Sequence, residues 1–391
     1  MTRRKLGIAV VGIGGAVGTT MAAGVELLRR NEIDTTGLPL AGIDPLANYT
    51  DITFAGWDLF DKDLASAAAD HEVLSIKQFA TVRQALGERR PWPAIADPRF
   101  LSNIEGTNVI SLAGVRSAVE QVRADIREFR AECDSVCVVN LASTEVLTDA
   151  TADTFASLDA FERAIDADST EISPAMLYAY AAIAEGVPYA NFTPSVAADI
   201  PALIEFADAQ KVPIAGKDGK TGQTFIKTVL APALRSRSLH IDGWYSTNIL
   251  GNRDGLALSN DGSLASKVKT KSSVLDDMLG YEVPDHLVDI RYYRPRGDNK
   301  EAWDNIDVSG FLGQRMQIKV NFLCRDSILA APLAIEIARC LDLAKERNEY
   351  GICEQLSVFF KLPMTRSAKP EHAFHMQEKM LLDWLNEGQN E

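Results

Sequence analysis

The chain has 391 residues, which is long enough for two structural units, each with its own hydrophobic core. Its formal net charge of −14 disfavours nucleic acid or an anionic membrane surface as the main partner, and no apolar run approaches the roughly 20 residues that span a bilayer. Five scattered cysteines are too few for a disulfide framework and indicate a reduced, cytoplasmic protein.

The first part of the chain alternates between strand and helix patterns. Strands are predicted at residues 6–11, 38–43, 52–54 and 135–141, and helices at residues 19–30 and 114–131. Such alternation is typical of an α/β protein, in which helices cover a parallel sheet.

After residue 200 the pattern changes to polar loops and strands. A glycine-rich polar loop at residues 216–224 precedes a predicted helix at 225–234. Further strands are predicted at 240–244, 288–293 and 316–323, and further helices from about Ser327 and at 376–385. We therefore expect a second, sheet-rich domain in the middle of the chain.

The clearest motif is a glycine turn at residues 12–18, which contains Gly12, Gly14, Gly15 and Gly18. It lies between the first predicted strand and the first predicted helix. In that context a glycine-rich turn lets the backbone approach a pyrophosphate at a helix N-terminus. A tight turn without a ligand is the alternative.

An acidic residue near this turn would bind the adenosine ribose. On the residues alone, Asp44 is the natural choice because it ends the strand predicted at 38–43, and Asp58 competes with it. An acid at this position favours NAD over NADP.

Several lysines lie in the polar loops of the second half. They are Lys217, Lys220, Lys267, Lys269, Lys271, Lys300 and Lys361. Any one lysine is usually a solvated surface charge. Lys361 differs because aromatic and apolar residues flank it, so its ammonium group either reaches solvent or enters a pocket.

An ordered set of short sequences runs through most of the chain. Besides the glycine turn, the set comprises Gly56-Trp57-Asp58, Ala142-Ser143-Thr144-Glu145, Glu171-Ile172-Ser173-Pro174, Leu177-Tyr178-Ala179-Tyr180, Lys220-Thr221-Gly222-Gln223-Thr224, Gly251-Asn252-Arg253-Asp254-Gly255, residues 266–271, Gly297-Asp298-Asn299-Lys300, and Asp326-Ser327 before Ala330-Ala331-Pro332-Leu333. This set resembles the inositol-3-phosphate synthase (myo-inositol-1-phosphate synthase) family. Eukaryotic members have asparagines at the positions of Ala16 and Val17, which indicates a prokaryotic member.

The resemblance implies a Rossmann-type NAD-binding domain made of residues 1–224 and 329–391. An inserted α+β domain at residues 225–328 would carry the catalytic residues and build a homotetramer. The resemblance implies NAD as cofactor and leaves open a requirement for a divalent or monovalent cation.

The resemblance also implies a role for individual residues. The catalytic residues would be Lys267, Lys271, Lys300, Lys361, Asp218, Asp254 and Asp326. The substrate would contact Asn248, Asn252, Thr221 and Gln223. The cofactor would contact Gly12, Gly14, Gly15, Ala16, Val17, Gly18, Asp58, Ala142, Ser143 and Thr144, so that Asp58 is preferred to Asp44.

The implied reaction is an NAD-dependent isomerisation in inositol and phospholipid biosynthesis. D-glucose 6-phosphate would become 1D-myo-inositol 3-phosphate by oxidation, enolisation, intramolecular aldol cyclisation and reduction. We expect Lys267 and Lys361 at the reacting oxygens, Lys271 and Lys300 at the phosphate, and Asp218 and Asp326 orienting lysines. The alternatives are a cyclitol-phosphate synthase acting on another sugar phosphate, a dehydrogenase that releases NADH, and a non-catalytic NAD-binding protein.

Overall fold

The chain folds into two compact units. The computed structural model describes residues 4–101, 106–110, 114–251 and 274–387. Unit 1 consists of Met1–Gly219, Ala330–Glu354 and Leu362–Ala368, and unit 2 of Lys220–Leu329, Gln355–Lys361 and Lys369–Glu391. Residues 355–361 and 369–391 therefore belong to unit 2 together with the inserted segment. The functional division at residues 224 and 328 stays a prediction.

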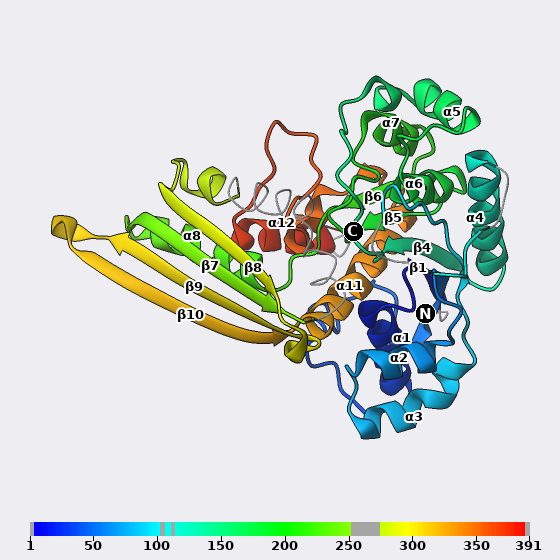
Figure 1. Cartoon of the computed structure of the whole chain (residues 1–391), viewed down its shortest axis with the longest axis horizontal. Coiled ribbons are helices and arrows are strands. Elements are labelled where there is room, and N and C mark those ends of the chain that lie inside the picture. Colours follow the sequence, from blue (N-terminus) through cyan, green and yellow to red (C-terminus); the bar gives the residue numbers. More distant parts are fainter. Residues whose placement is uncertain (1–3, 102–105, 111–113, 252–273, 388–391) are drawn as a thin grey trace. The chain divides into compact units, whose positions relative to one another are not determined.

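Unit 1 is built around a seven-stranded parallel sheet with the order β11-β6-β5-β4-β1-β2-β3, which confirms the expected α/β class. Figure 1 labels its central strands β6, β5, β4 and β1. Its strands are β1 (Leu6–Val11), β2 (Ile52–Asp58), β3 (Trp92–Pro93), β4 (Ser135–Asn140), β5 (Tyr189–Asn191), β6 (Pro213–Gly216) and β11 (Gly351–Ile352). All six residues of β1 are buried, as expected for a parallel strand covered on both faces. Because β1 pairs with both β2 and β4, the strand order reverses at β1.

Helices cover both faces of this sheet. They are α1 (Ala16–Arg29), α2 (Leu64–His71), α3 (Ile76–Gly87), α4 (Val115–Arg130), α5 (Leu158–Asp166), α6 (Pro174–Ala184), α7 (Pro201–Ala209) and the greater part of α11 (Asp326–Glu346). Val136 and Val138 of β4 join one core cluster with α4, α5, α6 and α7. Cys137, which lies between them, donates a hydrogen bond from its Sγ to the carbonyl oxygen of Ala338 in α11. Since successive side chains of a strand point to opposite faces, α11 covers the other face.

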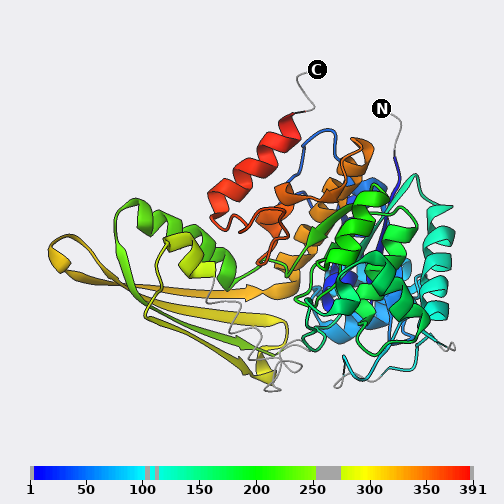
Figure 2. The same ribbon diagram turned by 90° about the horizontal axis from the view of Figure 1, so that it is seen from above.

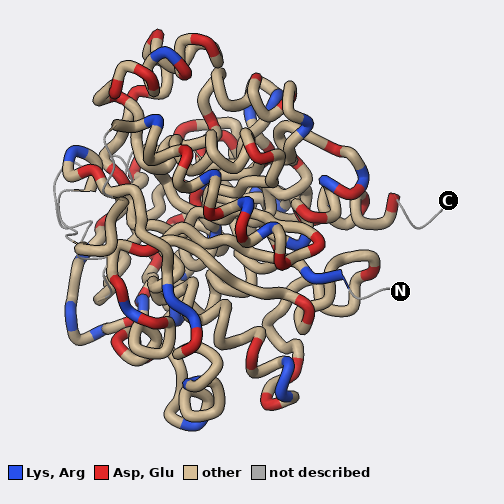
Figure 3. The backbone as a smooth tube through the Cα atoms, turned by 90° about the vertical axis from the view of Figure 1, so that its right-hand side faces the viewer, with Lys and Arg blue, Asp and Glu red and all other residues tan. Residues whose placement is uncertain are grey.

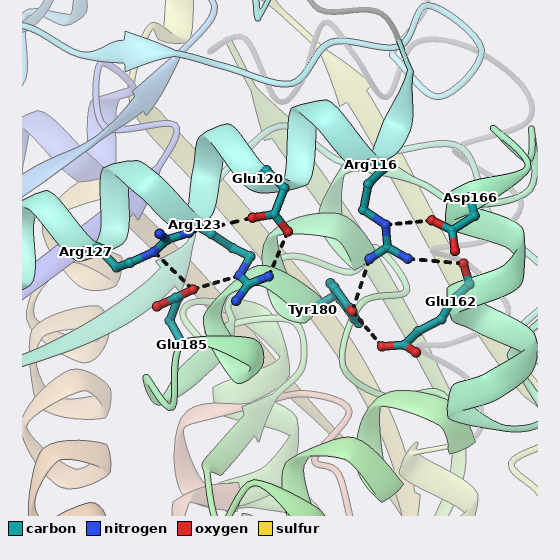
Figure 4. Close-up of polar contacts among 8 residues, drawn as sticks. All are labelled: Arg116, Glu120, Arg123, Arg127, Glu162, Asp166, Tyr180 and Glu185. Atoms are coloured by element: carbon teal, nitrogen blue, oxygen red, sulfur yellow. Dashed lines mark hydrogen bonds and ion pairs between the residues drawn. The ribbon is translucent and has the colours of Figure 1, made fainter.

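Ion pairs tie α4 to its neighbouring helices on the outside of unit 1 (Figure 4). Arg116 Nε lies 2.7 Å from the carboxylate of Asp166 in α5. Arg123 Nε lies 2.7 Å from the carboxylate of Glu185, the residue that ends α6, and Arg123 also contacts Glu120 one turn earlier. The carboxylates of Asp166 and Glu120 are exposed, and such pairs contribute little to stability, so the apolar face of α4 is what mainly holds it in place.

The strand predicted at residues 38–43 is wrong, because this segment forms turns. Its backbone bonds to side chains of α11 instead of a neighbouring strand. The Leu40 amide donates to Glu336 Oε1 at 3.3 Å, and the Leu40 carbonyl accepts from Arg339 at 3.4 Å. Both side chains are buried and form an ion pair at 2.5 Å, and the Tyr49 hydroxyl also donates to Glu336. Long-range contacts therefore override the local apolar pattern, which Pro39 and Gly42 already interrupt.

Unit 2 is built around a four-stranded mixed sheet with the order β10-β9-β7-β8. Its elements are β7 (His240–Leu250), β8 (Asp285–Tyr292), β9 (Asn299–Ser309), β10 (Arg315–Arg325), α8 (Gln223–Ser236) and α12 (Phe374–Asn386). Figure 2 shows α8 along one face of the sheet, where Ala231 and Leu234 pack against Trp244 and Ile306. The elements predicted at 225–234, 240–244, 316–323 and 376–385 are confirmed, whereas β9 was not expected.

Acidic and basic residues are intermingled along the chain (Figure 3). None of the five cysteines forms a disulfide bond. Among the described helices, none is both long and apolar enough to cross a membrane.

Candidate active site

The glycine turn directly follows β1, and two contacts fix its path. The amides of Gly12 and Ile13 both donate to the Trp57 carbonyl at the end of β2, at 2.8 and 3.2 Å. Gly12 has a φ of +85°, and a Cβ atom placed on it would lie 3.1 Å from the Ala142 Cα. A side chain at this position would therefore be both strained and crowded.

The turn ends at the N-terminus of α1, which is well suited to an anion. Gly15 is the N-cap and supplies no side-chain hydrogen bond, and the first turn holds no acidic residue. The amides of Ala16, Val17 and Gly18 therefore lie at a helix end whose orphan donors and dipole favour negative charge. These residues fit the pyrophosphate of NAD.

Asp58 ends β2 beside the glycine turn. Its Oδ2 accepts a hydrogen bond from the Gly14 amide at 2.9 Å, and its Oδ1 accepts one from the Phe60 amide at 3.1 Å. Asp44 instead follows a series of turns, because the strand expected before it does not form. The local geometry supports Asp58 as the residue for the ribose, and the role itself stays a prediction.

Ala142, Ser143 and Thr144 follow β4 on the other side of β1. The Leu141 amide donates to the Val11 carbonyl at 2.9 Å, and the Ala142 amide donates to Asn140 Oδ1 at 3.1 Å. The predicted cofactor residues therefore gather at the carboxyl ends of β1, β2 and β4, where the strand order reverses. Doubly wound sheets bind dinucleotides at this point.

Gly14→Val is expected to abolish NAD binding measured by calorimetry. A Cβ atom on Gly14 would lie 2.9 Å from Asp58 Oδ2, so the side chain would displace this carboxylate and occupy the space of the pyrophosphate. Gly24→Val is the matched control, because a Cβ atom at Gly24 of α1 meets nothing within 4 Å. Equal NAD affinity in the Gly14→Val protein would refute this location of the nucleotide.

Asp218 lies in unit 1 just after β6. It has a φ of +62°, and its amide donates to the Thr193 carbonyl at 3.0 Å. The neighbouring Lys217 forms an ion pair with Asp199 at 2.6 Å, in which both side chains are mostly buried. Asp218 is thus held on a tightly bonded loop, and its proposed role toward a lysine stays a prediction.

Two predicted site residues of unit 2 meet at a third, Asp326, which is the first residue of α11. Its Oδ1 accepts a hydrogen bond from the Thr221 hydroxyl at 2.9 Å and lies 3.6 Å from Lys300 Nζ. Lys300 comes from β9, and Thr221 precedes α8. The carboxylate can therefore hold the Lys300 ammonium group in place, as expected for a residue that orients a lysine.

Two predicted substrate contacts also meet in unit 2. Asn248 of β7 donates from its Nδ2 to Gln223 Oε1 at 2.5 Å. Both side chains are almost fully buried. Gln223 is the first residue of α8, whose N-terminus has no side-chain cap and no acidic residue in its first turn.

Two further lysines of unit 2, Lys220 and Lys227, are buried. The sequence predicts no role for them, although it predicts roles for the nearby Thr221 and Gln223. Burial lowers the pKa of Lys220 to about 7, and its Nζ donates to Gln377 Oε1. Burial lowers the pKa of Lys227 to about 8, and its Nζ lies 2.7 Å from His286 Nε2. In the sequence, Lys227 lies among apolar residues of a predicted helix, and its burial could have been predicted from that position.

Lys361 belongs to unit 2 and is half-buried after the buried pair Phe359 and Phe360. Four other predicted residues lie outside the described residues: Lys267, Lys271, Asn252 and Asp254. Within the described part of the chain, no group of three or more His, Cys, Asp or Glu side chains is arranged to hold a metal ion.

Comparison with known proteins gives consistent matches over nearly the whole chain. The sequence profile of the family described as myo-inositol-1-phosphate synthase matches residues 30–386. The chain is 43% identical to a protein of Bacteroides thetaiotaomicron named inositol-3-phosphate synthase 1, covering 97% of this chain and 95% of that protein. It is 31% identical to the rice protein of the same name, covering 96% of this chain and 84% of the relative. The crystal structure of inositol-3-phosphate synthase from Caenorhabditis elegans matches with a TM-score of 0.91 and 29% identity, covering 98% of this chain and 86% of that one.

Proposed function

The chain belongs to the myo-inositol-1-phosphate synthase family, and we propose that it is an NAD-dependent isomerase converting D-glucose 6-phosphate to 1D-myo-inositol 3-phosphate. The observation that carries the proposal is the identity of 43% to a bacterial synthase over nearly its whole length. The glycine turn at an uncapped helix N-terminus beside Asp58 supports the cofactor.

The residues of unit 1 bind and orient the cofactor in this proposal. When bound, NAD⁺ supplies a hydride acceptor for C5 of the sugar and a hydride donor at the end of the cycle. The turn amides of Ala16, Val17 and Gly18 hold the pyrophosphate, and Asp58 accepts hydrogen bonds from the ribose hydroxyls.

The residues of unit 2 stabilise the negative charge that develops on the sugar oxygens. Oxidation at C5 acidifies the C6 proton, and the resulting enolate attacks the C1 aldehyde to close the ring. Fixed ammonium groups in a site that excludes water stabilise these oxygens far better than bulk water does. We assign this role to Lys361 and Lys267, and the phosphate to Lys271 and Lys300, which Asp326 holds at 3.6 Å.

The proposed function is tested by incubating the protein with glucose 6-phosphate and substoichiometric NAD⁺ and identifying the product by NMR. We expect many turnovers to 1D-myo-inositol 3-phosphate for each NAD⁺, with no net NADH in the absorbance at 340 nm. NADH formed in step with product would instead identify a dehydrogenase. Turnover with a different sugar phosphate alone would identify a related cyclitol-phosphate synthase.

We also propose that the protein is a cytoplasmic homotetramer that assembles through the sheet of unit 2. β10 ends the sheet order and carries exposed Met316 and Leu323. An end strand with apolar side chains is a surface that proteins usually cover. Light scattering at micromolar concentration should give four times the chain mass, and a monomeric mass would contradict the proposal. The absence of a disulfide bond among the five cysteines supports a reducing compartment.

A further inference from the structure

The interior of unit 2 contains a carboxylate to which neither the sequence motifs nor the mechanism assigns a role. Asp304 of β9 is 1% exposed. Its Oδ1 accepts three hydrogen bonds, from Gln223 Nε2 at 3.1 Å, Trp244 Nε1 at 2.7 Å and Ser246 Oγ at 2.6 Å. Three donors on one buried oxygen hold this carboxylate in a single position.

The carboxylate determines which way the neighbouring amides point. An ionised carboxylate only accepts hydrogen bonds, so Gln223 must turn its NH₂ group toward Asp304. Its Oε1 then faces Asn248 and accepts from Asn248 Nδ2 at 2.5 Å. Asn248 must consequently use its NH₂ group for Gln223, which leaves its carbonyl oxygen as the free end of the chain of amides.

That free end is a buried acceptor without a donor. Asn248 is 1% exposed, and no described residue donates a hydrogen bond to its Oδ1. A buried carbonyl oxygen left unpaired is costly, so native structures nearly always supply a partner. The missing partner must be a donor, and a sugar hydroxyl is such a group.

The surroundings keep this network in a low-dielectric region. Trp244 and Ser246 are fully buried, and Lys227 is 3% exposed. The Lys227 ammonium group lies over the Trp244 ring at 5.5 Å from its centroid. The direction of each hydrogen bond is fixed most strongly in such a region, because water does not replace a missing donor or acceptor.

We propose that Asp304 is a positioning residue that, through Gln223, fixes Asn248 Oδ1 as the acceptor for one ring hydroxyl of the sugar phosphate. The inference rests on the proposed function and adds to it the direction of one hydrogen bond. The site recognises a hydroxyl that donates to Asn248 Oδ1 and rejects a group that cannot donate.

The test measures discrimination between glucose 6-phosphate and its analogues with fluorine in place of the hydroxyl at C2, C3 or C4. Fluorine is of similar size and cannot donate a hydrogen bond. We expect the native enzyme to prefer the parent sugar in kcat/KM at one of these positions, on the order of 10- to 100-fold beyond the preference of an Asn248→Ala enzyme. In Asp304→Asn the amide of Gln223 is free to turn, so this extra preference should fall toward 1.

The ratio separates positioning from a merely structural role. A partly unfolded enzyme loses activity equally on both sugars, and the intrinsic effect of fluorine on the chemistry is the same in every variant. Ser246→Ala is the matched control, because it removes one hydrogen bond to Asp304 Oδ1 without altering Gln223 or Asn248. It should keep the native ratio.

Each outcome decides between the proposals. The inference is overturned if the native discrimination persists in Asp304→Asn. It is also overturned if Ser246→Ala lowers the discrimination as much as Asp304→Asn does. If Asp304→Asn does not fold, Gln223→Ala breaks the same link, and an unchanged ratio there overturns it too. Conversion of glucose 6-phosphate without extra discrimination at any position overturns the inference alone. No conversion by the native enzyme overturns the proposed function, and the inference with it.

Discussion

Replacing Lys361 by alanine is expected to lower kcat by on the order of 10²–10³, the usual cost of removing one preorganised group that stabilises charge on a reacting oxygen. The same effect is expected for Lys267→Ala, whose ammonium group is assigned to the reacting oxygens as well. KM for glucose 6-phosphate should change much less, because the lysines act on charge that develops only during the reaction. Steady-state kinetics with saturating NAD⁺ measure both constants.

Stability should change little in Lys361→Ala, since a half-buried ammonium group is costly to keep away from water. Lys269→Ala is the control, because Lys269 lies between Lys267 and Lys271 in the sequence and matches no catalytic position. It should retain normal turnover and change the free energy of unfolding by less than about 0.5 kcal/mol. Near-normal turnover of Lys361→Ala, or a Lys269→Ala enzyme impaired as severely as Lys267→Ala, would show that these lysines are wrongly assigned.

Glu336→Gln is expected to lower the free energy of unfolding by about 3–5 kcal/mol, the cost of leaving one member of a buried ion pair uncompensated. Glu336 is fully buried and lies 2.5 Å from Arg339, which is 3% exposed. The substitution keeps the shape of the side chain and leaves the Arg339 charge without a counter-charge. It also weakens the hydrogen bond from the Tyr49 hydroxyl. Urea denaturation should show the loss as a lower midpoint.

Glu120→Gln provides the matched control in the same unit. Glu120 forms an ion pair three residues away from Arg123, as Glu336 does from Arg339, but its side chain is 47% exposed (Figure 4). Solvent screens such a pair, so the substitution should cost less than about 1 kcal/mol. The double substitution of Glu336 and Arg339 by leucine and methionine should recover most of the loss, because it leaves no buried charge. Equal costs for Glu336→Gln and Glu120→Gln would contradict this account.

Local patterns in the sequence predicted the first strand, the glycine turn and the first helix well. The strand at residues 6–11 is β1 itself, and the turn that follows leads into α1 as expected. These elements could be predicted because their signals are short-range: a continuous apolar run, glycines at fixed spacing and a helical period. The need for glycine at position 56 has no such short-range signal, since it arises from the neighbouring strand: a Cβ atom there would lie 2.0 Å from the Val10 carbonyl oxygen.

Features set by distant residues could not be predicted from the sequence pattern. Residues 38–43 form a short apolar run, but Glu336 and Arg339, almost 300 positions later, bond to the backbone of Leu40. Asp304 was missed for another reason. It lies between the buried residues Ala302 and Ile306 on one face of β9, so a polar residue at a buried position, with Trp303 on the opposite face, interrupts the apolar alternation that would have predicted the strand. The roles of the four catalytic lysines stay predictions from family resemblance.

The discontinuity of unit 1 has a consequence for its synthesis. β11 and the part of α11 from Ala330 onward are translated only after all four strands of the unit 2 sheet. Until then a nascent chain holds β6 with an unpaired edge, since β11 pairs with that side of β6 in the finished fold. The face of β4 that carries Cys137 likewise waits for its cover from Ala338. An open strand edge and an uncovered apolar face are the surfaces that chaperones bind during translation, so ribosomes stalled before Ala330 should carry chaperone-bound chains.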